Sequence, residues 1–324
     1  MMGRNYYIFK EGRIRRSQNT VFLETQEGKR PLPINDIDQI FIFGEMDLNT
    51  AFLNFIGANK IVVHFFNYYG YYTGSFVPRE TNISGDLTVK QAQHYLDGSA
   101  RLFIAKKFVE GAAHNMKRNF EKREGFGEEV EKIGNLAVNI LDCRTINELM
   151  SVEAHIKKIN YECIEKATSW EFERRAIRPP QNPLNAMISF GNSLVYAHIL
   201  KEIYETPLNP SISFLHEPFQ RRFSLSLDVA EVFKPILVDR LVMRLINLGI
   251  ITEEHFERSL NFAYLKEEGR KIFVKHFDEM LEERVLHRKL KRRIKYKNLI
   301  KLELYKLVKH FLGEKVYSPL KVWW

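Results

Sequence analysis

The sequence changes character at about Pro78, and this change limits the folds that the chain can adopt. Before it, short runs of aromatic and β-branched residues alternate with glycine and proline, a pattern typical of strands joined by turns. From Asp86 onward, apolar residues recur at the spacing of three and four residues that is typical of amphipathic helices. We therefore predict an α+β chain with a β-strand domain over residues 1–85, followed by an all-α helical domain over residues 86–324.

The same patterns predict the individual elements. In the first part we expect a short helix at 47–59 and strands at 6–9, 13–16, 20–24, 39–43, 61–66 and 75–77. In the second part we expect helices at 88–118, 128–142, 145–168, 184–204, 224–248, 253–266, 269–290 and 291–312. Prolines interrupt the helical pattern at 178–183 and 206–213, which we expect to be loops.

Length and composition exclude several classes of protein. The chain has 324 residues, of which 45% are hydrophobic and 27% charged, as in globular proteins. No apolar run approaches the roughly 18 residues that would span a bilayer, and the first residues lack the layout of a signal peptide. Cys143 and Cys163 cannot build a disulfide framework or a zinc cage by themselves. We therefore expect a cytoplasmic protein without a membrane partner.

The positive charge of the chain is concentrated in one segment. The formal net charge is +9, and residues 284–301 alone carry nine Lys and Arg residues and no acidic residue. Leu286, Leu290 and Ile294 recur there every four residues, which predicts a helix with one buried face. Its outward basic residues would then contact the phosphate backbone of a nucleic acid or be merely solvated. The residues we select as DNA contacts are Arg288, Lys291, Arg292 and Lys295.

The predicted helix at 145–168 carries the first candidate site residue. Thr145 and Glu148 have the spacing of a capping box, which predicts where this helix starts. Glu153 lies at the edge of its apolar stripe, and Lys157 follows four residues later on the same face. Without further information this is an exposed Glu–Lys pair, worth a few tenths of a kcal/mol.

A second group of candidate residues lies in the segment 214–240. His216 precedes a proline-containing turn, and the helix that follows, capped by Ser224, carries Asp228 and Glu231. Two carboxylates on one helix face near a histidine can hold a hard divalent cation, Mg²⁺ or Mn²⁺. Lys234 is one helical step beyond Glu231, where it can meet a phosphate. The alternative is that these residues are ordinary polar residues of the protein surface and form no site.

Proline also bears on the shape of this second segment. Pro235 follows Lys234 directly and lies inside the helical pattern. A proline within a helix removes a backbone hydrogen bond, so we expect a kink just past Glu231.

Three stretches of the chain resemble a known family. They are ELMSVEAHIKKINY (148–161), RPPQNPLNAMISFGNSLVY (178–196) and FLHEPFQRRFSLSLDVAEVFKPILVDR (214–240). The whole sequence is similar to the integrase and endonuclease family known as CRISPR-associated protein one. The resemblance implies an N-terminal β domain and a C-terminal all-α domain that carries the active site.

The resemblance also implies roles for individual residues. Glu153, His216 and Glu231 match the family's metal ligands, Asp228 matches an acidic neighbour of the site, and Lys234 matches a basic residue beside it. The third ligand is Glu where the family has Asp or Glu, and Lys234 stands where many relatives have Arg.

The implied function is antiviral defence in a prokaryote. Such proteins act with CRISPR-associated protein two, form homodimers through the β domain, bind double-stranded and branched DNA, and insert captured foreign DNA into a repeat array by transesterification. Two other functions stay open at the level of the sequence. One is a stand-alone, structure-selective DNase with the same metal site, and the other is a non-catalytic nucleic-acid-binding adaptor.

Overall fold

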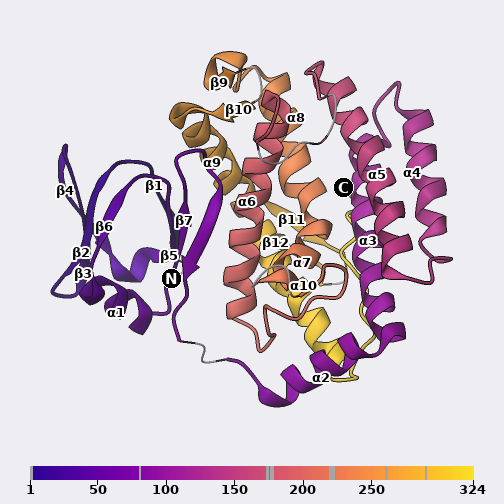
Figure 1. Ribbon diagram of the computed structural model, residues 1–324, viewed down its shortest axis with the longest axis horizontal. Coiled ribbons are helices and arrows are strands. Elements are labelled where there is room, and N and C mark those ends of the chain that lie inside the picture. The colour runs from indigo at the N-terminus through magenta and orange to yellow at the C-terminus, as the bar shows by residue number, and fades with distance from the viewer. Residues whose placement is uncertain are drawn as a thin grey trace.

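The computed structural model describes residues 3–79, 82–172, 175, 179–218, 223–259, 262–288 and 290–324. Two small sheets and one helix form the N-terminal part, and the remaining helices pack beside them (Figure 1). This is the predicted α+β class, with strand-rich sheets first and a helical region second. No helix among the described residues is both long enough and apolar enough to cross a bilayer.

The first sheet faces the helical part. Its strands, in spatial order, are β1 (Arg4–Ile8), β5 (Ile37–Ile42), β7 (Val62–Phe66) and β8 (Tyr72–Phe76). β1, β5 and β7 run parallel, and β8 is antiparallel to β7. Parallel strands need coverage on both faces. The helices cover one face of this sheet, and the second sheet and α1 cover the other.

The second sheet contains a strand that the sequence did not reveal. Its order is β4 (Gly28–Pro33), β3 (Thr20–Thr25), β2 (Gly12–Ser17) and β6 (Met46–Leu48). β4 contains Pro31 and Pro33, which argue against a strand, but it lies at the sheet edge, where a missing N–H group is tolerated. The predicted helix at 47–59 is α1 (Thr50–Ala58), capped by Asn49, whose side chain accepts from Phe52 N at 2.9 Å.

The helical part keeps most of the predicted helices. They are α2 (Gly85–Leu96), α3 (Gly98–Phe120), α4 (Gly127–Asn139), α5 (Ile146–Thr168), α6 (Pro183–Tyr204), α7 (Ser224–Lys234), α8 (Arg240–Asn247), α9 (Glu267–Glu282) and α10 (Tyr296–Phe311). The single helix expected at 88–118 is two helices. Asp97 has extended backbone angles and its carboxylate caps the start of α3 by accepting from Ser99 N and Ala100 N, so a new helix begins there.

Pro235 continues the helical path between α7 and α8 in place of a simple kink. It opens a π-helical segment, Pro235–Asp239, that joins the two helices. A proline leaves a helical carbonyl without its donor, and wider helical turns accommodate this. On α3, Asn115 and Asn119 donate to the carbonyl oxygens of Val232 and Pro235, at 2.9 and 2.8 Å. Side chains from a neighbouring helix therefore stabilise this irregular segment.

Two further expectations of continuous helix were wrong. In place of a helix at 253–266, the described residues there form a 3-10 turn (Glu253–His255) and two paired antiparallel strands, β9 (Phe256–Ser259) and β10 (Phe262–Leu265). The basic segment 284–301 holds a second hairpin, β11 (Arg284–His287) and β12 (Arg292–Lys295), before α10 begins. Of the three apolar residues that suggested a helix face there, Ile294 is buried, but Leu286 and Leu290 are exposed.

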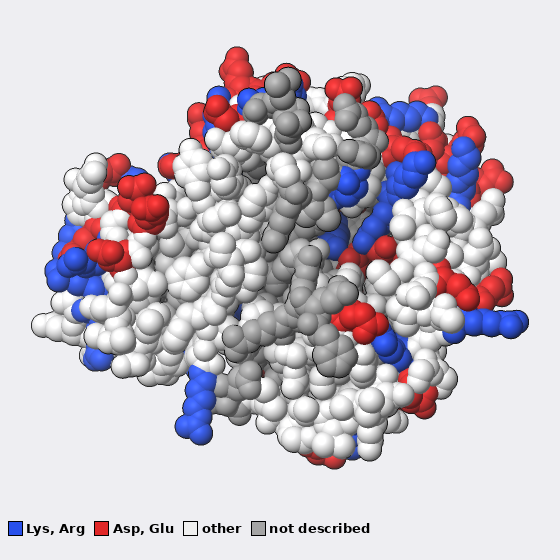
Figure 2. All heavy atoms as spheres, viewed as in Figure 1, with Lys and Arg blue, Asp and Glu red and all other residues white. Residues whose placement is uncertain are grey.

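A buried polar network joins the first sheet to the helices. Gln39 of β5 lies 2.8 Å from the Nδ1 atom of His198 on α6, and Tyr7 of β1 donates to Asp278 of α9 at 3.0 Å. Lys201 of α6 pairs with Asp38 at 2.8 Å. In Figure 2 the surface over this junction is largely uncharged, while acidic and basic side chains lie mixed over the helical part at the right of the view.

The aromatic face of the first sheet is not free. Phe41, Phe43 and Phe66 are buried in the core that they share with α6 and α9. A second core, which includes Ile14 and Phe52, fills the space between the two sheets and α1. The N-terminal part is therefore packed against the helices and does not leave this aromatic face open for a second copy.

Candidate active site

Glu153 is positioned by α5, and the start of that helix follows the predicted capping chemistry with one change. Thr145 caps it, because its hydroxyl accepts from Glu148 N at 3.2 Å. The side chain of Glu148 accepts from Arg144 N at 2.7 Å, one residue before the cap that the capping box predicts. Glu153 itself is largely buried, with 13% of its side chain exposed.

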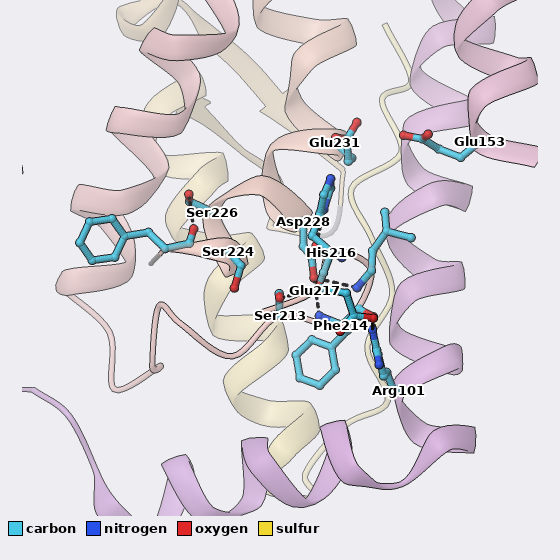
Figure 3. Close-up of polar contacts among 12 residues, drawn as sticks. Arg101, Glu153, Ser213, Phe214, His216, Glu217, Ser224, Ser226, Asp228 and Glu231 are labelled. Carbon is cyan, nitrogen blue, oxygen red and sulfur yellow. Dashed lines mark hydrogen bonds and ion pairs between the residues drawn. The ribbon is translucent and has the colours of Figure 1, made fainter. Parts of the chain in front are cut away.

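Glu231 lies on α7 and meets two lysines. Its Oε1 atom is 2.6 Å from the ammonium of Lys234, and its Oε2 atom is 2.9 Å from the ammonium of Lys157. Lys157 also pairs with Glu153 on its own helix. The ammonium of Lys157 therefore bridges the carboxylates of Glu153 and Glu231, which lie on different helices. Figure 3 shows the side chains of Glu153 and Glu231 facing one another. Only 1% of the Glu231 side chain is exposed, so these ion pairs are shielded from water.

These ion pairs form a cluster of two carboxylates and two ammonium groups, so its formal charges sum to zero; its members are Glu153, Glu231, Lys157 and Lys234. Burial alone would raise the pKa of Glu231, but Lys157, Lys234 and His216 hold that pKa well below its usual value. Burial opposes the charge on Lys157 too, yet Glu231 and Glu153 raise its pKa well above the ordinary value. The directions of these shifts keep both Glu231 and Lys157 charged at neutral pH.

His216 lies in the loop before α7, and Asp228 fixes that loop. The Oδ2 atom of Asp228 accepts from the N–H groups of Phe214 and Leu215, at 2.6 and 3.0 Å. Its Oδ1 atom lies 2.7 Å from His216 Nδ1. A carboxylate oxygen accepts, so Nδ1 carries a proton, and in the neutral form of the ring Nε2 has the lone pair that a metal ligand needs. Asp228 is thus a positioning residue.

Ser224 does not cap α7 as we expected. The residue that precedes this helix is Phe223, and within the described part of the chain no side chain caps the first turn. The hydroxyl of Ser224 instead donates to the carbonyl oxygen of Ser211 at 3.1 Å.

The donor set fits a divalent cation, although it is not arranged as a ready cage. Among the described residues, no three His, Cys, Asp or Glu side chains are grouped closely enough to hold a metal ion. Glu153, Glu231 and the Nε2 atom of His216 nevertheless supply two carboxylates and one imidazole, which suit Mg²⁺ or Mn²⁺. The buried Oε2 atom of Glu231 accepts no hydrogen bond from the described part of the chain, and the cation beside it is Lys157.

Asp239 is a site neighbour that sequence reasoning missed. It lies in the π-helical segment, is buried, and accepts from Asn160 of α5 at 2.9 Å. Burial raises the pKa of Asp239 to about 6, against the opposing effects of Asn160, Lys234 and Lys157. The signal was available in the sequence, since an acidic residue that ends the apolar run PILVD is seldom left without a polar partner.

The four basic residues selected as DNA contacts lie on or beside the second hairpin, and they are not equivalent. Lys295 is paired with Glu282 and mostly buried. The guanidinium of Arg288 lies 5.6 Å from the ring centre of Trp323. Lys291 and Arg292 are exposed. The segment is therefore a basic hairpin, and its contact with DNA stays a prediction.

We predict that Lys157→Met lowers the free energy of unfolding by about 3 kcal/mol, because two largely buried carboxylates would lose their shared cation. Lys158→Met is the matched control. Lys158 is exposed and lies 3.9 Å from Glu162, so its loss should change stability by less than about 0.5 kcal/mol. Urea unfolding of both variants measures the difference. Equal losses would contradict the bridging role of Lys157.

We also predict a distinct pH dependence for Asp239→Asn. The pKa of Asp239 is about 6 in the folded protein and about 3.9 in an unfolded chain. Its contribution to stability is therefore complete below pH 3.9 and is lost as the pH rises through 6, a loss of about 3 kcal/mol. Urea unfolding between pH 4 and 7 should show the wild type losing this much relative to the variant. Parallel profiles would contradict the prediction.

Known proteins resemble this chain over nearly its whole length. A family profile described as CRISPR associated protein Cas1 matches residues 6–279. A curated relative from Moorella thermoacetica, named CRISPR-associated endonuclease Cas1 2, is 56% identical over 99% of this chain and 100% of its own length. A solved Cas1 protein from Thermotoga maritima is 39% identical, with a TM-score of 0.91 over 98% of this chain and 100% of that one.

A more distant likeness concerns the fold alone. The chain aligns over its full length with 37% of a chain in a solved Cas6-RT-Cas1–Cas2 complex, at 15% identity and a TM-score of 0.87. The matched profile and the relatives that are similar over nearly the whole chain show that this chain belongs to the Cas1 family of CRISPR-associated proteins.

Proposed function

We propose that this protein is a metal-dependent DNA endonuclease and integrase that inserts captured foreign DNA into a CRISPR repeat array. The observation that carries the proposal is the cluster in which Glu153 of α5 and Glu231 of α7 share one cation beside His216. Carboxylates from separate helices that meet in a buried place are costly for stability, and such clusters are typical of active sites. Membership of the Cas1 family supports the same conclusion.

Glu153, His216 and Glu231 would hold the divalent cation, Mg²⁺ or Mn²⁺. When bound, such an ion polarises a phosphodiester and stabilises charge on the attacking and leaving oxygens. Lys157 must then leave the two carboxylates, because the cluster of Glu153, Glu231, Lys157 and Lys234 is already neutral. The released ammonium of Lys157 becomes a partner for the negative charge of the DNA phosphate.

The proposed reaction is a transesterification. A 3′-hydroxyl of the captured DNA loses its proton and forms a bond to phosphorus at the repeat boundary, while the bond from that phosphorus to the outgoing 3′ oxygen breaks and this oxygen gains a proton. Lys234, which is held by Glu231 at 2.6 Å, offsets charge on the other phosphate oxygens. Asp228 keeps His216 in the tautomer that can ligate. Attack by water in place of the hydroxyl would give endonuclease activity.

The proposed partners are DNA, a second copy of this chain and CRISPR-associated protein two. The solved complex named Cas6-RT-Cas1–Cas2, whose resemblance concerns the fold alone, contains Cas2 beside a chain with this fold. Paired DNA ends require two active sites, which supports a homodimer.

We predict that Glu153→Gln, His216→Asn and Glu231→Gln each lower metal-dependent cleavage of branched DNA at least about 100-fold, because each removes one ligand. Gln is preferred to Ala at 231 because it fills the same volume between two buried lysines. Glu162→Gln is the matched control, since Glu162 lies exposed on the same helix as Glu153. Retained cleavage in any ligand variant would remove that residue from the site.

The same variants and the wild type distinguish between the proposed function and its two alternatives. Joining of DNA into a repeat-containing plasmid, assayed with CRISPR-associated protein two present, should require the three ligands as cleavage does. Cleavage without joining would indicate a stand-alone DNase. Binding without either reaction would indicate an adaptor.

We predict that the full-length protein is a dimer by light scattering at micromolar concentration, with twice the mass of the 38.3 kDa chain. Full-length protein is needed because an isolated segment 1–85 would expose Phe41, Phe43 and Phe66, which pack against the helices here. A monomeric mass would contradict the proposal that one assembly presents two sites.

A further inference from the structure

A recess lined by four arginines lies outside the candidate active site. It has a volume of about 340 Å³ and lies between the C-terminal end of α3, the helix α8 and the last residue, Trp324. Its charged residues are Arg118, Arg123, Arg240 and Arg244, and no acidic residue of the described chain lines it. None of these residues belongs to the cluster around Glu231. Arg240 is nine positions beyond Glu231, which is about 13 Å along a helical path.

Only two of the four arginines have an acidic partner among the described residues. Among the described residues, no carboxylate lies within ion-pair distance of Arg123 or Arg240, although Arg118 pairs with Glu121. Arg244 is 3.4 Å from Glu283, and both side chains are about half exposed. Helix C-termini favour single cations, and this accounts for an arginine at the end of α3 or α8. It does not account for four that face one recess.

Hydrogen bonds fix the position of the Arg240 side chain in the recess. Its Nε atom donates to the side-chain oxygen of Asn119 at 2.6 Å, and a terminal nitrogen of the guanidinium donates to the main-chain oxygen of Trp324 at 3.4 Å. Burial, together with the nearby charges of Arg118 and Arg123, lowers the pKa of Arg240 in spite of the opposing effect of Tyr296. Like charges repel one another here, and an anion bound between them would relieve the repulsion.

The recess adjoins the basic hairpin. Trp324 lines the recess and packs edge-on against Tyr296, the first residue of α10 after β12. Its neighbour Trp323 faces Arg288 of the hairpin, at 5.6 Å. The two tryptophans therefore connect the arginines of the recess to the positive charge of the hairpin in one surface.

We infer that this recess binds a phosphate group of a nucleic acid strand, at a place separate from the reacting phosphodiester. Guanidinium groups bind phosphate oxygens in pairs, and four of them suit a phosphate better than a carboxylate side chain. The hairpin continues the track for neighbouring phosphates. This assignment rests on the proposed function in one respect only, namely that the nucleic acid is DNA.

The test measures DNA binding in EDTA, without any divalent ion, so that it does not depend on catalysis. The variant is Arg123→Gln with Arg244→Gln. The matched control is Arg13→Gln with Arg30→Gln, which removes the same charge from exposed positions on the second sheet. Fluorescence anisotropy with a labelled duplex at several salt concentrations gives both the affinity and its salt dependence. Circular dichroism checks that both proteins are folded.

We expect the recess variant to bind at least about tenfold more weakly at 0.1 M salt, with a slope of log affinity against log salt that is smaller by about 1 to 2. The control should change affinity less than about threefold and leave the slope unchanged. Equal losses in both proteins, or no loss in the recess variant, would overturn the inference. Because no divalent ion is present, a loss of binding in the recess variant cannot come from loss of metal at the active site, which separates failure of the recess from failure of the proposed function.

A second arm distinguishes the source of the phosphate. Thermal unfolding is compared in inorganic phosphate and in sodium chloride of the same ionic strength. If phosphate raises the melting temperature of the wild type but not of the recess variant, while DNA affinity is the same in both, the recess takes free phosphate and the assignment to nucleic acid is overturned. Weaker DNA binding by the recess variant supports it whether or not free phosphate protects.

Discussion

The shared ion pairs of Lys157 with Glu153 and Glu231 connect α5 to α7, and much of the proposed chemistry depends on them. Two carboxylates cannot stay charged in a buried place without a cation between them. Lys157 supplies that cation and Lys234 balances the second negative charge. The cluster can therefore assemble before any metal ion is bound. The free-energy cost of burying its charges is offset by the other interactions that form when the protein folds.

The positions of these carboxylates depend in turn on irregular backbone. Pro235 and its π-helical segment follow Glu231 closely, and Asn115 and Asn119 of α3 stabilise the carbonyl groups there. Asp228 organises the loop of His216 through three backbone N–H groups. The second charged region, the arginine recess, lies at the far end of the same path, where Arg240 begins α8. One irregular helix thus links the candidate active site to a candidate phosphate site.

Local chemistry made some parts of this structure predictable from the sequence. The cap at Thr145 placed the start of α5, and residues 224–234 followed a clear helical period. The hairpin at 284–295 was not predictable, because apolar spacing of four residues is compatible with a helix and only Ile294 is buried. The bridge from Lys157 to Glu231 was hidden as well: the i, i+4 pair with Glu153 is visible in sequence, but a partner on another helix depends on tertiary packing.

The most direct test of the account is a crystal structure of the protein soaked in Mn²⁺, with the ion located by its anomalous scattering. The account predicts a peak within ligand distance of Glu153, Glu231 and the Nε2 atom of His216, with the ammonium of Lys157 moved away from both carboxylates. A Mn²⁺ peak elsewhere, or an unmoved Lys157 with no ion beside it at saturating Mn²⁺, would contradict it.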